Sequence, residues 1–323
     1  MNKKPVIFPS INVELEEFRS RYFALYKSSN PLLQRLLSYV LKGNGKMMRP
    51  ILILLTAKYF GPIQEKIYHV SSALELLHTG SLVHDDVVDN SSERRGNLSV
   101  NEAFSNKQAV LLGDYIVAMS LEEALKSGNI QIVQILSMLA MKLSEGEIIQ
   151  LNSRKDNALS EELYFDIIKK KTASLFSSCS RSAALVCNAT AQELDAFEQF
   201  GFFSGICFQI KDDIFDYFKS KEIGKPFGND LREGKFTLPA IYALNKSGQD
   251  WESRIAAVKS CVATDNEIGE IIDFTVAHGG VSYAEQKMRE YRNKAINSLP
   301  LSMDKGLRDC FETYIDVIIG RSK

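Results

Sequence analysis

The sequence predicts an all-α fold, and three observations support this prediction. The chain has 323 residues and eight prolines, but no proline occurs between Pro62 and Pro226, so long helices can form throughout that stretch. Within it, residues 130–143 and 194–218 carry apolar side chains three and four positions apart, as one buried face of a helix requires. Alternation of apolar and polar residues at every second position, which is typical of strands, is rare.

Segments rich in Gly, Asn, Ser or charge divide the chain into the expected helices. These breaks are residues 42–45, 90–99, 127–129, 152–160, 220–234, 246–249 and 278–280. Each is too short for an interdomain linker, so we expect one domain over residues 1–323, with residues 1–29 as an N-terminal helical extension. The longest apolar run, around residues 51–55, is far shorter than a membrane-spanning helix.

The positive and negative residues of the chain are nearly equal in number, so the protein carries almost no net charge. Lys and Arg total 39 and Asp and Glu total 40, so the bulk charge attracts neither nucleic acid nor an anionic membrane. The five cysteines are odd in number and lack metal-ligand spacing, which is typical of reduced cysteines in a cytosolic protein. The apolar stretch near the N-terminus is interrupted by Pro5 and Pro9 and is too short for a signal peptide. We therefore expect a cytoplasmic protein that binds no nucleic acid.

Two copies of one acidic motif stand out in this balanced chain. Their carboxylates occupy positions i, i+1 and i+4 of two apolar helical segments: Asp85, Asp86 and Asp89, and then Asp212, Asp213 and Asp216. Charges packed so closely repel one another unless a cation neutralises them. Mg²⁺ binds one or two carboxylates and completes its octahedron with water and phosphate oxygens. The two motifs therefore predict a Mg²⁺-bound diphosphate, and the alternative is two solvated acidic patches.

Polar residues extend both motifs along their helices. His78, Asp85 and Asp89 are spaced so that the histidine and the two carboxylates share one helical face. A single histidine on a helix is more often structural, but this one lies two turns before a motif of the metal-binding type. Gln209 lies on the same polar stripe as the aspartates of the second motif, opposite an apolar stripe used for packing.

Four groups of basic residues lie near the acidic motifs in the sequence. They comprise Lys46 with Arg49, Arg94 with Arg95, Lys169 to Lys171, and Lys225 with Lys235. Each group alone is typical of a solvated surface. Together they supply counter-charge for more phosphate than one site would need.

Five motifs occur in order along the chain from about residue 30 to the C-terminus. They are Gly45-Lys46-x-x-Arg49-Pro50, His84-Asp85-Asp86-x-x-Asp89 with Arg94-Arg95-Gly96, Lys171-Thr172, Gly205-x-x-Phe208-Gln209-x-x-Asp212-Asp213-x-x-Asp216, and Gly224-Lys225 with Glu233-Gly234-Lys235-x-Thr237-Leu238-Pro239. In this order the chain resembles the trans-isoprenyl diphosphate synthases of the polyprenyl synthetase family, above all the long-chain octaprenyl and polyprenyl diphosphate synthases. It departs from the family at Asn44, where a second glycine is common, which puts the shape of that loop in doubt.

The resemblance implies a single helical domain around a deep apolar cavity, with both acidic motifs at its mouth, in a homodimer. It also implies the reaction. An allylic diphosphate loses its diphosphate, and the double bond of isopentenyl diphosphate attacks the resulting cation in a head-to-tail condensation. About three Mg²⁺ ions, for which Mn²⁺ can substitute, are expected to bind the leaving diphosphate.

The resemblance further implies roles for individual residues. Metal ligands are expected at Asp85, Asp89, Asp212 and Asp216, with Asp86 and Asp213 binding through water. The leaving diphosphate is expected to contact Arg94, Lys171, Lys225 and Lys235. Isopentenyl diphosphate is expected to bind, without metal, to Lys46, Arg49, His78 and Arg95. Thr172 and Gln209 are expected to place oxygen dipoles beside the carbocation.

Product length is expected to depend on residues just before the first motif. One helical turn rises about 5.4 Å, which is comparable to one isoprene unit. In short-chain members of the family, aromatic residues four or five positions before the first aspartate close the tunnel, but here Ser81 and Gly80 occupy those positions. We therefore expect a product of about C30 to C50, used as a quinone side chain and made from farnesyl diphosphate as the allylic substrate. The alternative is that both residues only permit close helix packing, with Met119 or Met138 as the stop.

Three other functions compete with this prediction. A short-chain farnesyl or geranylgeranyl diphosphate synthase would share every motif. A class I terpene cyclase would share the fold but needs no second diphosphate site, so Lys46, Arg49 and Arg95 argue against it. A non-catalytic subunit of a heteromeric synthase typically lacks one acidic motif, whereas both are intact here.

Overall fold

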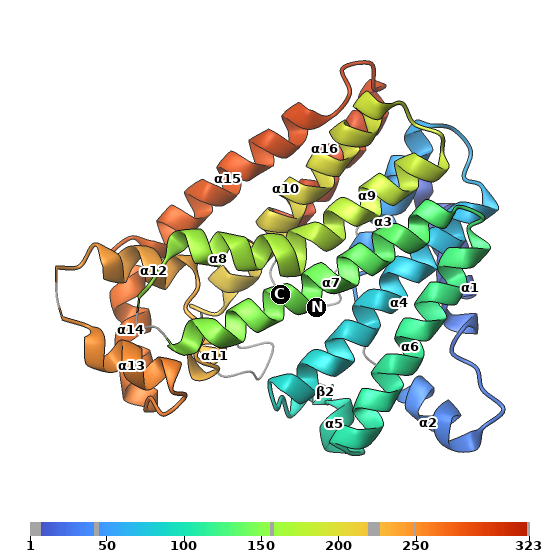
Figure 1. Cartoon of the computed structure of the whole chain (residues 1–323). Helices are drawn as coiled ribbons and strands as arrows, with labels where there is room; N and C mark the ends of the chain where they lie inside the picture. The colour runs from blue at the N-terminus through green and yellow to red at the C-terminus, as the bar shows by residue number, and fades with distance from the viewer. Residues whose placement is uncertain (1–7, 42–44, 156–157, 219–226, 249, 322–323) are drawn as a thin grey trace. The chain divides into compact units, whose positions relative to one another are not determined.

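The computed structural model describes residues 8–41, 45–155, 158–218, 227–248 and 250–321. This part of the chain is almost entirely helical, which confirms the predicted all-α fold (Figure 1). Its pair of strands, β1 (Glu93–Arg94) and β2 (Asn97–Leu98), forms a short antiparallel hairpin inside the break predicted at residues 90–99. Such short strands leave no alternating pattern in the sequence. None of the described helices combines the length and apolar composition needed to cross a bilayer.

The chain divides into two compact units. The first unit consists of Met1–Ala140, Leu175–Gly201 and Ser298–Tyr314, and the second of Met141–Ser174, Phe202–Asn297 and Ile315–Lys323. The first acidic motif therefore belongs to the first unit and the second motif to the second unit. The expectation of one domain over residues 1–323 stays a prediction.

The first unit carries the N-terminal helices. Its complete helical elements are η1 (Pro9–Ile11), α1 (Asn12–Ala24), α2 (Pro31–Val40), α3 (Met48–Tyr59), α4 (Glu65–Val88), α5 (Val100–Ala103) and α6 (Asn106–Lys126). Helix α1 lies within residues 1–29, for which the sequence predicts a helical extension.

The second unit carries the shorter helices of the C-terminal half. Its complete elements are η3 (Ser153–Lys155), α8 (Glu161–Ile168), the π-helical turn η4 (Lys169–Ala173), α11 (Asn229–Arg232), α12 (Leu238–Asn245), α13 (Glu252–Lys259) and α14 (Asp265–Ala277). The helices that contribute residues to both units are α7 (Ile130–Asn152), α9 (Ser174–Val186), α10 (Ala191–Phe215), α15 (Gly280–Ser298) and α16 (Lys305–Gly320).

Local signals explain where several helices begin and end. The side chain of Asn30 accepts hydrogen bonds from two backbone N–H groups in the first turn of α2. Thr264 and Glu267 form a capping box at the start of α14. Gly128 adopts a φ of 73° just after α6, as a glycine that terminates a helix commonly does. This residue accounts for the break predicted at residues 127–129.

The core of the first unit is built around α3 and α4. Residues 51–55 of α3, the longest apolar run in the sequence, are all buried. Helix α4 packs along α6 (Figure 1). At Gly80 the two helices approach so closely that a Cβ atom would lie 2.9 Å from Val117 Cγ2 and 3.2 Å from the carbonyl oxygen of Gly113. Any larger residue at position 80 would therefore push α6 away from α4.

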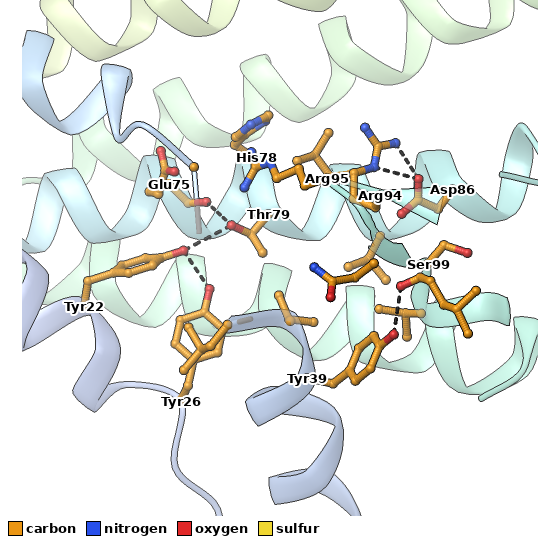
Figure 2. A pocket seen from close by; sticks show the side chains of 18 of the residues that line it. Tyr22, Tyr26, Tyr39, Glu75, His78, Thr79, Asp86, Arg94, Arg95 and Ser99 are labelled. Atoms are coloured by element: carbon orange, nitrogen blue, oxygen red, sulfur yellow. Dashed lines mark hydrogen bonds and ion pairs between the residues drawn. The ribbon is translucent and has the colours of Figure 1, made fainter. Parts of the chain in front are cut away.

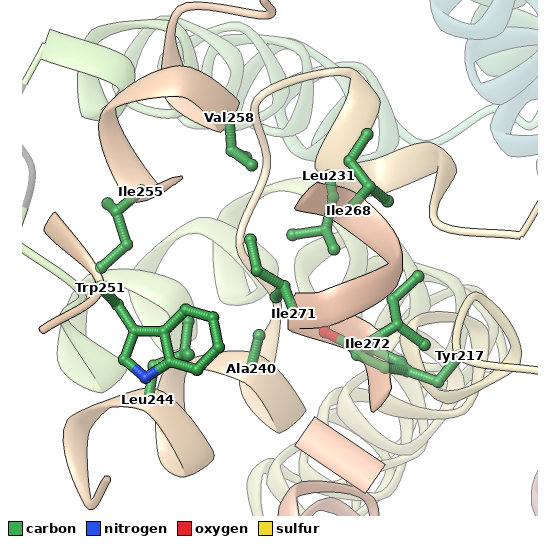
Figure 3. Packing of buried hydrophobic residues seen from close by; sticks show 10 residues of the cluster. All are labelled: Tyr217, Leu231, Ala240, Leu244, Trp251, Ile255, Val258, Ile268, Ile271 and Ile272. Atoms are coloured by element: carbon green, nitrogen blue, oxygen red, sulfur yellow. The ribbon is translucent and has the colours of Figure 1, made fainter. Parts of the chain in front are cut away.

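The second unit has a hydrophobic core of its own, to which α11, α12, α13 and α14 contribute (Figure 3). Its buried members are Tyr217, Leu231, Ala240, Leu244, Trp251, Ile255, Val258, Ile268, Ile271 and Ile272. Trp251 also packs against Phe274, with ring centroids 4.7 Å apart. Each large side chain buried here stabilises the fold by about 1.5–3 kcal/mol. This core supports the segment that carries Asp230 and Lys235.

Candidate active site

The first acidic motif lies at the end of α4. Asp89 is the C-terminal cap of the helix, and its backbone N–H donates to the carbonyl oxygen of Asp85 at 2.8 Å. Asp86 is buried and paired with Arg94, whose Nε donates to Oδ1 of Asp86 at 2.9 Å. Burial lowers the pKa of Arg94, but the bond to Asp86 and the charges of the other two aspartates outweigh it and raise that pKa. Arg94 is therefore a permanent cation beside the motif.

A pocket of about 80 Å³, lined by both polar and apolar side chains, adjoins this motif (Figure 2). Of the residues predicted to bind isopentenyl diphosphate, His78 and Arg95 line it. Glu75, Tyr22 and Tyr26 also line it and were not among the predicted residues. The hydroxyl groups of the two tyrosines lie 2.6 Å apart in a buried hydrogen bond. Tyr22 of the N-terminal helix α1, together with Tyr26 just after it, therefore lies along one side of the pocket.

Arg95 reaches the pocket from the tight turn of the hairpin. Arg95 and Gly96 have φ values of 53° and 78°, as in the two-residue turns that connect antiparallel strands. The left-handed conformation is unfavourable for an arginine, and such residues cluster at functional sites. The guanidinium lies against Gly45, where a Cβ atom would be only 3.0 Å from the Arg95 nitrogens. Gly45 therefore leaves the space that this cation occupies.

The other two cations predicted for this site flank the start of α3. Lys46 is exposed, and the Arg49 guanidinium lies 4.9 Å from the ring centroid of Phe176. Met47, between them, has a φ of 52° and lines the pocket. The structure thus brings the segment of Lys46 and Arg49 to the pocket that contains His78.

Burial controls the charges inside this pocket. It raises the pKa of Glu75 above its ordinary value, and the neighbouring Arg49 and Arg95 oppose that shift. Burial, followed by the charges of Arg49, Arg95 and Arg94, holds the pKa of His78 well below its ordinary value of 6.5. The imidazole is therefore neutral at pH 7 and offers hydrogen bonds without charge. Positive charge in this pocket comes from the arginines, which suits a diphosphate.

The second acidic motif lies at the end of α10, where the half-buried Asp212 and the buried Asp216 have different partners. Asp212 forms an ion pair with Arg321, with 2.8 Å between Oδ1 and Nη2. The two carboxylate oxygens of Asp216 accept hydrogen bonds from the backbone N–H groups of Asn229 and Asp230, each at 2.9 Å. Asp216 therefore joins the motif to α11 in addition to its predicted role as a metal ligand.

Asp213 is buried within a chain of hydrogen bonds. The hydroxyl of Tyr164 donates to its Oδ2 at 2.5 Å, and Nε2 of Gln209 donates to its Oδ1 at 2.9 Å. The hydroxyl of Thr172 in turn donates to Oε1 of Gln209 at 2.6 Å. Burial raises the pKa of Asp213 to about 7. The charges of Asp212 and Asp216 also raise this pKa, whereas the hydrogen bonds from Tyr164 and Gln209 lower it. The structure thus joins Thr172 and Gln209 directly to the second motif.

Lys171 and Thr172 lie in the π-helical turn η4 between α8 and α9. π-Helical turns are rare in proteins, and those that occur are often found at functional sites. Lys171 forms an ion pair with Glu147, and its Nζ also donates to Oε1 of Gln150 at 3.2 Å. Its charge is therefore held in one place before any substrate binds.

A second pocket, of about 200 Å³, collects several predicted residues of the second unit. Lys171, Gln209, Asp213 and Lys235 all line it. Lys235 is paired with Glu233, with 2.7 Å between Nζ and Oε2. Lys225, the remaining cation predicted for this site, lies outside the described residues.

The carboxylates of the second motif fit a divalent cation. Burial, followed by the charges of Asp216 and Asp213, raises the pKa of Asp230 well above its ordinary value. Carboxylates that repel one another in this way gain stability when a cation lies among them. Among the described residues, no three Asp, Glu, His or Cys side chains converge as a ready-made metal cluster. That arrangement still suits Mg²⁺, because most of its ligands are water and substrate phosphate oxygens.

Sequence reasoning missed Tyr164, Glu75, Asp230 and Arg321. Helical periodicity could have indicated Tyr164, because it precedes Lys171 by seven residues, the spacing of one helical face. Arg321 lies at the far end of the chain from its partner, so no local pattern joins it to the second motif. Glu75 precedes His78 by three residues and could have been found from the same stripe.

The residues expected to control product length have different surroundings. Gly80 faces α6 at the close contact with Val117, as the alternative of close helix packing requires. Ser81 is half-buried, and its hydroxyl donates to the carbonyl oxygen of His78 at 2.9 Å. Met119 is half-buried, whereas Met138 is exposed. Of the two small residues, Gly80 therefore lies at a close helix contact, whereas the Ser81 side chain is partly exposed.

A family model described as polyprenyl synthetase matches residues 30–275. The chain belongs to the polyprenyl synthetase family. This polyprenyl synthetase is therefore a prenyltransferase of isoprenoid biosynthesis, a class that uses isopentenyl diphosphate, an allylic diphosphate and Mg²⁺. It is 31% identical over 289 residues to the octaprenyl diphosphate synthase of Haemophilus influenzae, which covers 89% of this chain and 88% of that protein.

Two solved structures resemble this polyprenyl synthetase over nearly its whole length. A geranylgeranyl pyrophosphate synthase from Bacteroides thetaiotaomicron is 42% identical, with a TM-score of 0.84 and coverage of 96% of this chain and 97% of that one. A polyprenyl synthase from Caulobacter crescentus, complexed with calcium and isoprenyl diphosphate, is 27% identical, with a TM-score of 0.91 and coverage of 97% and 96%. Both confirm the all-α fold of the family.

Proposed function

We propose that this polyprenyl synthetase joins isopentenyl diphosphate head-to-tail to an allylic diphosphate and repeats the step to make a long all-trans polyprenyl diphosphate. One observation carries the proposal: each unit has a pocket with charged side chains in its lining beside its own acidic motif. Arg94 and Arg95 line the first pocket, while Lys171 and Lys235 accompany carboxylates in the second. Two sites for anionic groups suit a reaction between two diphosphates, whereas a terpene cyclase needs only one.

The reaction begins when the allylic carbon–oxygen bond breaks and diphosphate leaves with the bonding electrons. The double bond of isopentenyl diphosphate attacks the allylic cation, and the new cation loses a proton from the adjacent carbon. The released diphosphate accepts that proton, so no side chain is needed as a base. About three Mg²⁺ ions, or Mn²⁺ in their place, would supply positive charge against the leaving diphosphate.

The residues divide into groups by role. Metal ions would be held by Asp85, Asp89, Asp212 and Asp216, with Asp86 and Asp213 acting through water. The leaving diphosphate would contact Arg94, Lys171, Lys225 and Lys235. Isopentenyl diphosphate must not ionise, so it would bind without metal to Lys46, Arg49, His78 and Arg95. Thr172 and Gln209 would stabilise the allylic cation with their oxygen dipoles.

We propose a product of about C30 to C50, suited to a quinone side chain, with farnesyl diphosphate as the first allylic substrate. The small, half-buried Ser81, one turn before Asp85, supports this length, as does the likeness to an octaprenyl diphosphate synthase. A short-chain product is the second candidate. The likeness to a structure named as a geranylgeranyl pyrophosphate synthase favours that alternative.

We also propose a homodimer in the cytoplasm. Helix α6 exposes large apolar side chains that a second copy could cover. These are Val110, Leu111, Tyr115, Leu121 and Leu125. The five cysteines are free, which suits a reducing compartment. Light scattering on the purified protein tests the dimer, and a monomer at working concentration would contradict it.

Product analysis tests the proposed reaction. Purified protein is incubated with Mg²⁺, isopentenyl diphosphate and farnesyl diphosphate, and the products are identified by mass spectrometry after removal of phosphate. We expect a ladder that ends at about C30 to C50. A hydrocarbon formed without isopentenyl diphosphate would identify a cyclase instead. Complete inactivity of the purified protein by itself would favour a non-catalytic subunit.

A further inference from the structure

A buried tyrosine outside the predicted site ends the hydrogen-bond chain of the second unit. Tyr164 lies on α8, is 6% exposed, and donates its hydroxyl hydrogen to Oδ2 of Asp213 at 2.5 Å. Gln209 donates to the other oxygen of the same carboxylate at 2.9 Å. Thr172 donates to the amide oxygen of Gln209 at 2.6 Å. The chain therefore runs from Thr172 through Gln209 to Asp213, which also accepts from Tyr164.

The carboxylate decides the orientation of the Gln209 amide. Both oxygens of the Asp213 carboxyl group accept hydrogen bonds, one from Tyr164 and one from Gln209, so the NH₂ group of Gln209 faces Asp213 and its carbonyl oxygen faces Thr172. The reversed amide would place two acceptors in contact and leave both unsatisfied, which is costly in a buried site. The hydroxyl hydrogen of Thr172 is then committed to Gln209. Lone pairs of the Thr172 oxygen, and the second lone pair of the Gln209 carbonyl, are left to face the pocket.

This orientation matters for a reaction that passes through a carbocation. An oxygen lone pair directed at electron-deficient carbon is attractive, whereas an O–H or N–H hydrogen directed at it is repulsive. Thr172 and Gln209 both line the second pocket, so the direction of their dipoles determines the field there. A side-chain amide held from one side only can rotate and present its NH₂ group to the pocket instead.

We infer that Tyr164 is a positioning residue: it holds the Asp213 carboxylate so that Gln209 and Thr172 present oxygen lone pairs to the reacting carbon. This inference rests on the proposed function and deepens it. Geometry supports this inference, because Gln209 and Asp213 lie one turn apart on α10. Tyr164 contacts Asp213, and Thr172 contacts Gln209. Tyr164 itself need not touch the substrate.

The test is Tyr164→Phe in the full-length protein, which keeps the buried ring and removes only the hydroxyl. We expect kcat for condensation to fall about tenfold or more, while KM for each substrate changes less than about threefold. We also expect a larger share of allylic diphosphate to be lost as alcohol, because a poorly stabilised cation is captured by water. Tyr283→Phe is the matched control, since Tyr283 of α15 donates a tyrosine-to-carboxylate hydrogen bond at 2.9 Å to Glu161, which lies on the same helix α8 as Tyr164. It should leave kcat unchanged.

A double-mutant cycle with Thr172→Val separates positioning from general damage. If Tyr164 acts through the chain, its loss should have little further effect once Thr172 is gone. Additive effects on kcat would overturn the inference. Calorimetry with Mg²⁺ and inorganic pyrophosphate should give the same affinity for wild type and Tyr164→Phe. A parallel loss of that affinity would overturn the inference by assigning the effect to metal binding.

The outcomes also separate this inference from the proposed function. A wild-type protein that forms no condensation product would overturn the proposed function itself. An active wild type with an equally active Tyr164→Phe variant, or a Tyr283→Phe variant that is equally impaired, would overturn only the role of Tyr164. Circular dichroism and thermal unfolding of each variant identify any loss of fold.

Discussion

His78 shows how burial decides what a side chain can contribute. Its place on α4 follows from helical spacing, but its protonation state does not. In the folded protein the imidazole is buried among Arg49, Arg94 and Arg95, and its pKa lies well below 6.5. Its proposed contact with isopentenyl diphosphate is therefore a neutral hydrogen bond, and the charge in that contact comes from the arginines.

This shift predicts a pH dependence of stability. Below its ordinary pKa, His78 is protonated in the unfolded chain but not in the folded one, so unfolding takes up a proton and becomes easier as the pH falls. The free energy of unfolding of wild type relative to His78→Gln should decrease between about pH 6.5 and pH 5, by up to about 1.4 kcal/mol per pH unit. Glu75 has a raised pKa, so its own contribution to stability grows as the pH falls. Because both proteins contain Glu75, this contribution cancels in the difference between them. Urea unfolding at several pH values measures the difference, and a constant difference would contradict the assignment.

Single cations should distinguish the two substrates. Arg49→Ala should raise the KM for isopentenyl diphosphate about 10- to 100-fold with little change in kcat, because a contact present in both ground and transition states contributes uniform binding. Lys171→Ala should act instead on the allylic diphosphate. Lys169→Ala is the control, since Lys169 is exposed and lies two residues from Lys171. Steady-state kinetics with each substrate varied in turn measure the effects. Equal changes for both substrates in the first two variants would refute the division into sites.

At the scale of the helix, the contact between α4 and α6 depends on Gly80. Gly80→Ala should destabilise the protein by about 1–3 kcal/mol, because its Cβ atom would press on Val117 and on the backbone of Gly113. Gly269→Ala is the matched control, because Gly269 lies within α14 with open space around it. There the same change should stabilise the protein by about 0.5–1 kcal/mol. Denaturant unfolding measures both, and equal effects would argue against close packing at Gly80.

The same helix is expected to set the product length, at Ser81. Ser81→Phe should shorten the product to about C15 to C20 while the first condensation stays active, since a bulky ring one turn before Asp85 would close the path of the growing chain. Ser81→Ala should leave the product unchanged, because it removes only the hydroxyl that bonds to His78. Mass spectrometry of the products decides. An unchanged product in the phenylalanine variant would show that another residue ends the tunnel.

At the scale of the whole molecule, each unit supplies one acidic motif. Asp85→Ala and Asp212→Ala should each lower turnover by several orders of magnitude, and a chelator should abolish it, because each motif is proposed to hold Mg²⁺ that neutralises the leaving diphosphate. The fold should survive both changes. The pair of Asp212 with Arg321 is partly exposed and is worth at most about 1 kcal/mol. Asp195→Ala, an exposed change on the same helix α10, is the control for activity. A wild-type rate in either motif variant, or full turnover in chelator, would contradict the mechanism.

The sequence by itself determined the fold class and the chemistry. Missing prolines and apolar spacing predicted the helices, and the breaks predicted at residues 90–99 and 127–129 fall between helices of the structure. The order of acidic and basic motifs predicted the family, which the comparisons confirmed. These features are local, because a helix and a charged motif each depend on residues that are close together in the sequence. The hairpin at Arg95 and the π-helical turn at Lys171 were missed, because such short elements leave no periodic signal.

Only the tertiary structure decided which partner each functional residue meets. Tyr164 reaches Asp213 from another helix, and Arg321 reaches Asp212 from the far end of the chain. The neutral state of His78 likewise depends on burial and on arginines from other segments. Hydrogen bonds and desolvation act between atoms that are close in space, whatever their separation in the sequence. No local pattern in this chain could therefore reveal them.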